Sequence, residues 1–202
     1  SATVKVALEE GSDAVSLSSN GTANCYIVSQ SGEYSFPTVK GNSSESVGAV
    51  ARAAVLWESF GTNVKPKVGD LIKSVSYKDG YITYQTADTF KEGNAVIAAK
   101  DASGKILWSW HIWLTDQPQS QVYNKNAGTM MDRNLGATSA EPGDVGALGL
   151  LYQWGRKDPF LGASSISSST VAKSTINWPS PVPTSSSCGK VSYVLAHPTT
   201  YV

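Results

Sequence analysis

Histidine, cysteine and charged residues are scarce in this chain of 202 residues. It has only 2 histidines and 2 cysteines, and 16% of its residues are charged. So few histidines leave little room for general acid–base or zinc chemistry. The 16 lysines and arginines balance the 16 aspartates and glutamates, so no basic field exists to attract nucleic acid or an anionic membrane.

Long apolar runs and signal sequences are also missing. No run approaches the twenty or so apolar residues of a membrane span, and the first residues do not form a signal peptide. Ser, Thr, Gly and Asn replace the missing charge, as in β-rich extracytoplasmic proteins. We therefore expect a mature extracytoplasmic protein whose leader has been removed, although a cytosolic protein would begin in the same way.

The two cysteines, Cys25 and Cys188, lie far apart in the chain. A disulfide between them would close a loop of roughly 160 residues and add up to about 5 kcal/mol in the entropy model. The alternative is two unpaired thiols, which we favour because Cys25 lies in an expected core strand, where cysteine acts as a small apolar residue. No CxxC motif or Cys/His spacing indicates a zinc site.

The most informative segment is Gly104–Thr115, which holds three tryptophans and a histidine. In an extended strand, alternate side chains share a face. The apolar face would carry Ile106, Trp108, Trp110, Ile112 and Leu114. The mixed face would carry Leu107, Ser109, His111, Trp113 and Thr115. We expect the central strand of a β-sandwich, whose mixed face is either a seam between two units or a binding platform.

Short extended segments separated by turn signals fill residues 1–116. Asp79-Gly80 predicts a two-residue hairpin, and Asp101–Gly104 predicts a second hairpin. Val55 and Trp57, on one face, favour a strand over a helical turn. The expected strands cover 3–8, 14–17, 23–29, 33–40, 53–58, 71–78, 81–86, 94–100 and 105–115. This pattern predicts a mainly β fold whose first domain, residues 1–116, is an antiparallel immunoglobulin-like sandwich.

Residues 117–202 are expected to form a small α+β unit. Apolar residues with helical spacing after an acidic, proline-containing start predict a helix over 145–156. Residues 191–196 are expected to form a strand, and residues 161–190, rich in Ser, Thr and Pro, a long surface loop. These elements are too few for an independent domain, so the unit is expected either to be incomplete or to complete the first domain.

Six short sequence blocks of the first domain together carry a resemblance to known proteins. They are Asn24–Val28, Gly32–Pro37, Val39–Asn42, Val55–Trp57, Gly93–Asp101 and Ile106–Trp113. Together they resemble large surface-exposed proteins of gut Bacteroidetes, which are grouped with fimbrillin-like and other lipid-anchored components. The resemblance implies display at the cell surface, with a lipid anchor in the full-length precursor.

A second pattern joins Met131–Ala137 (Met-Asp-Arg-Asn-Leu-Gly-Ala) with Leu151–Phe160. It is similar to the start of the major paralogous domain first noted in Fibrobacter, which is related to the C-type-lectin-like fold. In that family the domain continues beyond the position of Val202, which implies that this unit is truncated and that Cys188 has lost a partner. The calcium-site motifs of C-type lectins are missing, since Glu141-Pro142 is followed by Gly143. The resemblance therefore transfers neither calcium-dependent sugar binding nor any site residue.

The sequence holds no recognisable catalytic motif. A hydrolase of the Ser/His/Asp type needs a histidine beside a nucleophile, and only His111 and His197 are available, with no Gly-x-Ser-x-Gly elbow. Nothing singles out a glycosidase pair among the acidic candidates, which are Glu58, Asp70, Asp132 and Asp158. The last two lie beside Arg133 and Lys157 and can equally form ion pairs. We expect no catalytic residue, metal site or cofactor.

Aromatic residues offer a more economical route to function, because their faces stack on the C–H groups of sugars. Trp154 is expected to pack in the interior of the second unit. Trp113 is expected to pack between the units, and Trp178, in a proline-rich loop, is the best surface candidate. The candidate ligand-binding residues are Trp178, Trp113, Tyr123 and Tyr201.

These observations and the resemblance together predict a non-enzymatic cell-surface adhesion or pilus-associated binding protein of a gut bacterium. Its expected partners are glycans or other surface and pilus proteins. The alternative is a carbohydrate-binding module for polysaccharide capture. A third class, a secreted hydrolase, would require a pocket holding convergent acids, or His111 beside a nucleophile.

Overall fold

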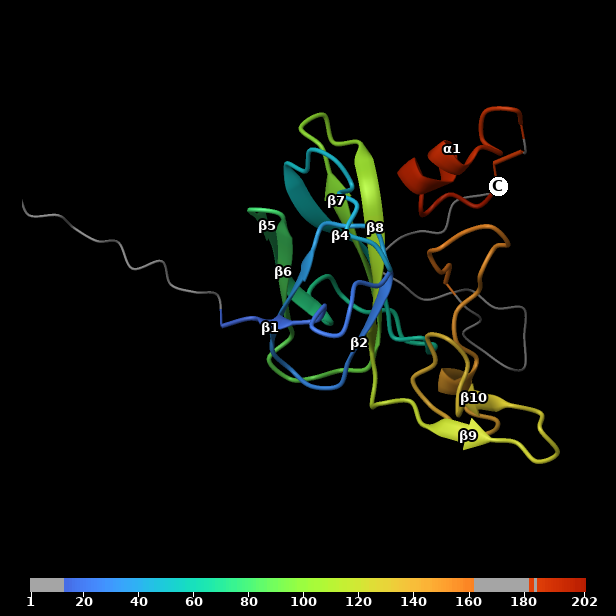
Figure 1. Cartoon of the computed structure of the whole chain (residues 1–202). Coiled ribbons are helices and arrows are strands. Elements are labelled where there is room, and N and C mark those ends of the chain that lie inside the picture. The colour runs from blue at the N-terminus through green and yellow to red at the C-terminus, as the bar shows by residue number, and fades with distance from the viewer. Residues whose placement is uncertain (1–12, 162–181, 184) are drawn as a thin grey trace, which may run out of the picture.

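The computed structural model describes residues 13–161, 182–183 and 185–202 (Figure 1). The strand expected over 3–8, most of the loop expected over 161–190 and the candidate Trp178 lie outside these residues. Within them, no helix has the length and apolarity needed to cross a membrane. The fold is mainly β and consistent with a β-sandwich.

Two four-stranded sheets make up the first part of the chain (Figure 1). The first sheet has the order β1 (Val15–Ser16), β3 (Glu33–Pro37), β6 (Tyr81–Thr86) and β5 (Ile72–Lys78). The second has the order β2 (Cys25–Val28), β8 (Ile106–Leu114), β7 (Gly93–Lys100) and β4 (Arg52–Ser59).

The expectation of purely antiparallel sheets was wrong. The edge strands β1 and β2 run parallel to their neighbours β3 and β8, so both sheets are mixed. Parallel neighbours need a crossover rather than a hairpin, and β2 and β8 are accordingly separated by five intervening strands. Turn signals in the sequence reveal hairpins but carry no information about such distant pairing.

The apolar core lies between the two sheets (Figure 1). Trp110 on β8 is fully buried, with its ring centroid 5.1 Å from that of Phe36. The Phe36 ring in turn lies 5.2 Å from Tyr26 and 6.3 Å from Tyr84. The predicted apolar face of β8 is confirmed for Trp108, Trp110, Ile112 and Leu114, which are buried in this core. Ile106, the fifth residue expected on that face, is half-buried and lies beyond a register shift between β7 and β8.

The Asp79-Gly80 hairpin is confirmed between β5 and β6. Both turn residues have left-handed backbone, with φ of 48° and 86°, as the commonest two-residue hairpin turn requires. The strand at β4 is also confirmed, but a β-bulge between Val55 and Trp57 separates their side chains. Val55 packs on the main core, whereas Trp57 joins a second cluster on the other side of the sheet. The shared face expected for them was therefore wrong, because one extra residue in a strand reverses the alternation.

The remaining chain has little regular structure. It contains a hairpin of β9 (Ser120–Val122) and β10 (Thr129–Met131), a short 3-10 turn at Val145–Ala147, and the helix α1 (Val191–Ala196). The helix expected over 145–156 was wrong. Gly149 adopts a left-handed φ of 73°, and the next two backbone N–H groups bond to Leu135 and Phe160 rather than to the preceding turn.

The strand expected over 191–196 was also wrong, since these residues form α1. The helix packs against β8, and Leu195 contacts the main core. Strand β8 is already paired on both sides, to β2 and β7, so residues 191–196 cannot pair with the strand they pack on, and a helix satisfies their backbone groups internally. The division of the chain at residue 116 stays a prediction.

Truncation of Trp110 is expected to destabilise the whole fold. The change Trp110→Ala removes the ring that joins the two sheets and should lower the free energy of unfolding by about 3–5 kcal/mol, measured by urea denaturation. The matched control is Val68→Ala, at a residue that is 89% exposed, with an expected change below about 0.5 kcal/mol. A loss below about 1 kcal/mol for Trp110→Ala would mean that this ring does not join the sheets.

Candidate functional site

The outer face of β8 is covered by later parts of the chain, and three alternate residues make the contacts. Ser109 donates a hydrogen bond of 2.9 Å to Asp158, and the indole N–H of Trp113 donates one of 2.9 Å to the carbonyl of Ala137. His111, between them, is 2% exposed. This mixed face is therefore not an open binding platform, because later parts of the chain cover it, and we call this set of contacts the seam.

A buried ion pair anchors one end of the seam. The Lys157 ammonium lies 2.7 Å from the Asp158 carboxylate and also donates to the Ser109 carbonyl at 2.6 Å. It lies 4.7 Å from the centre of the Trp108 ring, which adds a cation–π contact. Burial lowers the pKa of Lys157, while Asp158 opposes this shift. Asp158 thus forms the ion pair that its position beside Lys157 allows.

A chain of three hydrogen bonds crosses the middle of the seam. The Asn94 amide N–H donates to the Gly136 carbonyl at 2.8 Å, so its Oδ1 faces His111 at 2.8 Å. Because Oδ1 can only accept, His111 carries its proton on Nε2 and leaves Nδ1 as an acceptor. The Cys25 thiol, 3.2 Å from Nδ1, therefore donates. This relay links β2, β8 and β7 to the segment that follows β10.

Cys25, His111 and Asn94 are connected like the nucleophile, base and orienting group of a cysteine hydrolase. Their pKa shifts, however, are not those of such an enzyme. Cys25 is exposed as a residue because β2 is an edge strand, yet burial of its thiol raises the pKa to about 12. Burial also lowers the pKa of His111 to about 3. A reactive cysteine needs the opposite shifts, towards thiolate and imidazolium. The relay is therefore neutral and serves to connect strands. Both cysteines are free thiols.

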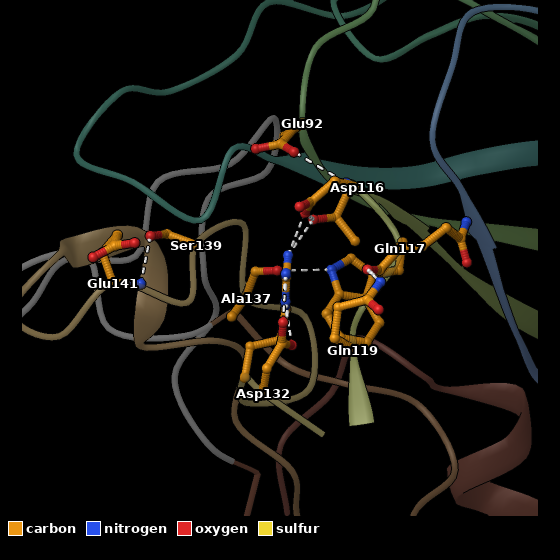
Figure 2. A network of polar contacts seen from close by, with 11 residues as sticks. Glu92, Asp116, Gln117, Gln119, Asp132, Ala137, Ser139 and Glu141 are labelled. Carbon is orange, nitrogen blue, oxygen red and sulfur yellow. Dashed lines mark hydrogen bonds and ion pairs between the residues drawn. The ribbon is translucent and has the colours of Figure 1, made fainter. Parts of the chain in front are cut away.

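A cluster around Arg133 fixes the other end of the seam, where this residue pairs with Asp116 and Asp132. Figure 2 labels both aspartates, with dashed lines running from each of them. Arg133 is 5% exposed in its side chain and donates to both oxygens of Asp132, at 2.8 Å and 3.0 Å. It also bonds to Asp116 and, at 3.1 Å, to the Thr115 hydroxyl. These hydrogen bonds lower the pKa of Asp116 and of Asp132. The cluster ties the chain after β10 to the end of β8.

A cavity of about 470 Å³ opens beside this cluster, between the β9–β10 hairpin and the chain that follows it. Its size falls within the range of small-molecule sites, which is roughly 300–1,000 Å³. The apolar part of its lining comprises Tyr123, Met130, Met131, Leu135, Ala140 and Ala147. The polar part comprises Asp132, Arg133, Asn134 and Ser139. A cavity that combines an apolar wall with a few polar groups has the features of a ligand site.

The four residues predicted from the sequence as ligand contacts are not brought together. Tyr123 is 48% exposed and lines the cavity. Trp113 is 1% exposed and packs in the seam, where no ligand can reach it in this structure. Tyr201 is exposed but lies elsewhere, with its ring edge-to-face against Phe160 at 5.4 Å. Trp178 is outside the described residues.

Several surface residues were missed by sequence reasoning. Trp154, expected in the core of the second unit, is 99% exposed, because the chain forms a turn there instead of the expected helix. Met130 and Met131 are 58% and 40% exposed. Adjacent residues of a strand point to opposite faces. Two consecutive methionines therefore cannot both face one core, and this was the sequence signal that at least one of them lies on the surface.

Acid should weaken the fold through His111. The unfolded imidazole takes up a proton near its ordinary pKa of about 6.5, whereas the buried one resists until about pH 3. Stability is therefore lost as the pH falls from about 6.5 to 3, by about 1.4 kcal/mol per pH unit from this group. Urea denaturation of the wild type and His111→Gln at pH 7, 6, 5 and 4 measures the difference in slope. Identical slopes would contradict a neutral buried imidazole.

Cys25 should react slowly despite lying on an edge strand. With a pKa of about 12, only on the order of 1 in 10⁴ thiols is ionised at pH 8. Iodoacetamide labelling followed by peptide mass spectrometry should show Cys25 modified at least a hundredfold more slowly in native than in urea-denatured protein. Labelling of the native protein as fast as of the denatured one would contradict the buried thiol, and faster labelling would show an activated thiol and would revive the hydrolase class.

Comparison with known proteins found no match to a family model, to a curated protein or to a solved structure. The resemblance seen in the sequence blocks therefore stays an expectation. The function is therefore inferred from the geometry of the seam and of the cavity.

Proposed function

We propose that this chain is a non-enzymatic cell-surface binding protein that mediates adhesion, with the part after β8 as its contact region. One observation carries the proposal. Among the described residues, ten of the fourteen large apolar side chains that are exposed belong to residues 117–202. Four of the ten line one cavity and so lie together, and contiguous exposed apolar patches often mark interaction sites. The ten exposed residues include Tyr123, Met130, Met131, Leu135 and Trp154.

The way the contact region is attached to the sandwich also supports a role in adhesion. The seam on β8 joins the contact region to the sandwich by buried hydrogen bonds and by ion pairs at both ends. A region fixed in this way can transmit force to the sandwich, which we propose to be an immunoglobulin-like spacer. The composition and the resemblance to surface proteins of gut Bacteroidetes support an extracytoplasmic, lipid-anchored location.

Beads that carry the intact protein test adhesion directly. Retention under flow on mucus-coated epithelial layers should fall at least tenfold for the double variant Met130→Ser with Met131→Ser, because it removes exposed apolar contacts. The matched control is Val64→Ser with Val68→Ser, two valines of the sandwich that are 61% and 89% exposed, and it should leave retention unchanged. Equal retention of all three proteins, or none for the wild type, would contradict the proposal.

A further inference from the structure

The charges at the cavity beside the β9–β10 hairpin are already paired with one another. Arg133 makes four hydrogen bonds, to Asp132, Asp116 and Thr115. Asp132 and Arg133 are the charged members of the lining, and each is the other's partner. Asp116, next to them, keeps 69% of its side chain exposed and adds negative charge. An anionic ligand would meet this surplus and would have to displace a carboxylate from Arg133 in order to pair with it.

The polar groups of the cavity keep hydrogen-bonding capacity that suits a neutral partner. The Ser139 oxygen accepts from the Glu141 backbone N–H at 3.1 Å, and its O–H can still donate a hydrogen bond. The Asn134 amide N–H donates to the Ala147 carbonyl at 3.2 Å, which turns its Oδ1 away as an acceptor. The carboxylate of Asp132 accepts from Arg133 and retains further lone pairs. Hydroxyl groups, which both donate and accept, match this mixture.

The apolar groups of the same cavity suit a ligand that has an apolar face besides its hydroxyl groups. Tyr123 presents an aromatic ring with about half of the residue exposed. Aromatic faces attract C–H groups that carry partial positive charge, and a tyrosine hydroxyl adds a polar edge. Met130 and Met131 are flexible side chains that fill irregular gaps around a bound ring. One molecular class combines an apolar C–H face with a rim of hydroxyls and no charge, and that class is the pyranose sugar.

We propose that this cavity binds an uncharged sugar ring, stacked on Tyr123 and hydrogen-bonded by Asp132, Asn134 and Ser139. The inference rests on the proposed adhesive function and names its ligand as a neutral glycan. The adhesion would then be lectin-like in effect but independent of calcium. A protein partner for the same surface is the competing occupant, and the experiment separates the two.

Binding of the intact protein to immobilised neutral hexose oligosaccharides is compared with binding to uronic-acid oligosaccharides of the same length. We expect the neutral glycans to bind and the acidic ones to bind at least tenfold more weakly. Tyr123→Ala should weaken neutral binding by about tenfold or more, equivalent to about 1.4 kcal/mol. Tyr123→Phe, which keeps the ring, should stay within about threefold. Tyr81→Ala removes a tyrosine of the sandwich that is 51% exposed and should change nothing.

The bead assay then assigns any failure to the correct hypothesis. Periodate treatment of the epithelial layer destroys sugar rings and should abolish retention, whereas protease treatment should leave a glycan-dependent part. The sugar proposal is overturned if no neutral saccharide binds, if acidic ones bind better, or if Tyr123→Ala binds normally. Retention that survives periodate but not protease identifies a protein partner, so adhesion stands and the sugar does not. Absence of all retention overturns both.

Discussion

Strand β8 is buried on both of its faces, and the two faces place opposite demands on the chain. The inner face carries tryptophan and branched aliphatic residues into the core of the sandwich. The outer face carries Ser109 and His111, whose polar groups cannot be left without partners once they are buried. Everything packed on the outer face therefore has to supply hydrogen bonds at defined places, and this requirement fixes where the irregular part of the chain lies.

His111 bonds to Cys25 and Asn94 on the neighbouring strands, and the other partners on the outer face come from the two sequence patterns that stand out after residue 116. The pattern around Arg133 contributes the guanidinium and the carbonyls of Gly136 and Ala137. The pattern that ends at Phe160 contributes Lys157 and Asp158. Both patterns can thus be explained by packing against β8 without any catalytic role. Because a partly satisfied polar network is worse than an apolar contact, this seam favours one arrangement of the two parts over looser alternatives.

Sequence periodicity predicted the parts of the fold that depend on neighbouring residues. The strands of the sandwich, the Asp79-Gly80 turn and the inner face of β8 follow from alternation and turn chemistry, which act over two to eight residues. The failures involve partners distant in the chain. The parallel pairing of β2 with β8, the bulge that turns Trp57 outward and the loss of the helix over 145–156 all result from contacts that local spacing does not encode.

The candidate site shows the same division. The sequence by itself marks Tyr123 as an aromatic candidate, and the adjacency of Asp132 and Arg133 allows their ion pair. That Tyr123 shares a cavity with Asn134 and Ser139, while Trp113 is buried and Trp154 is exposed, was decided by the three-dimensional packing. The physical reason is that alternation specifies which face a side chain takes, whereas exposure depends on what another part of the chain brings to cover that face.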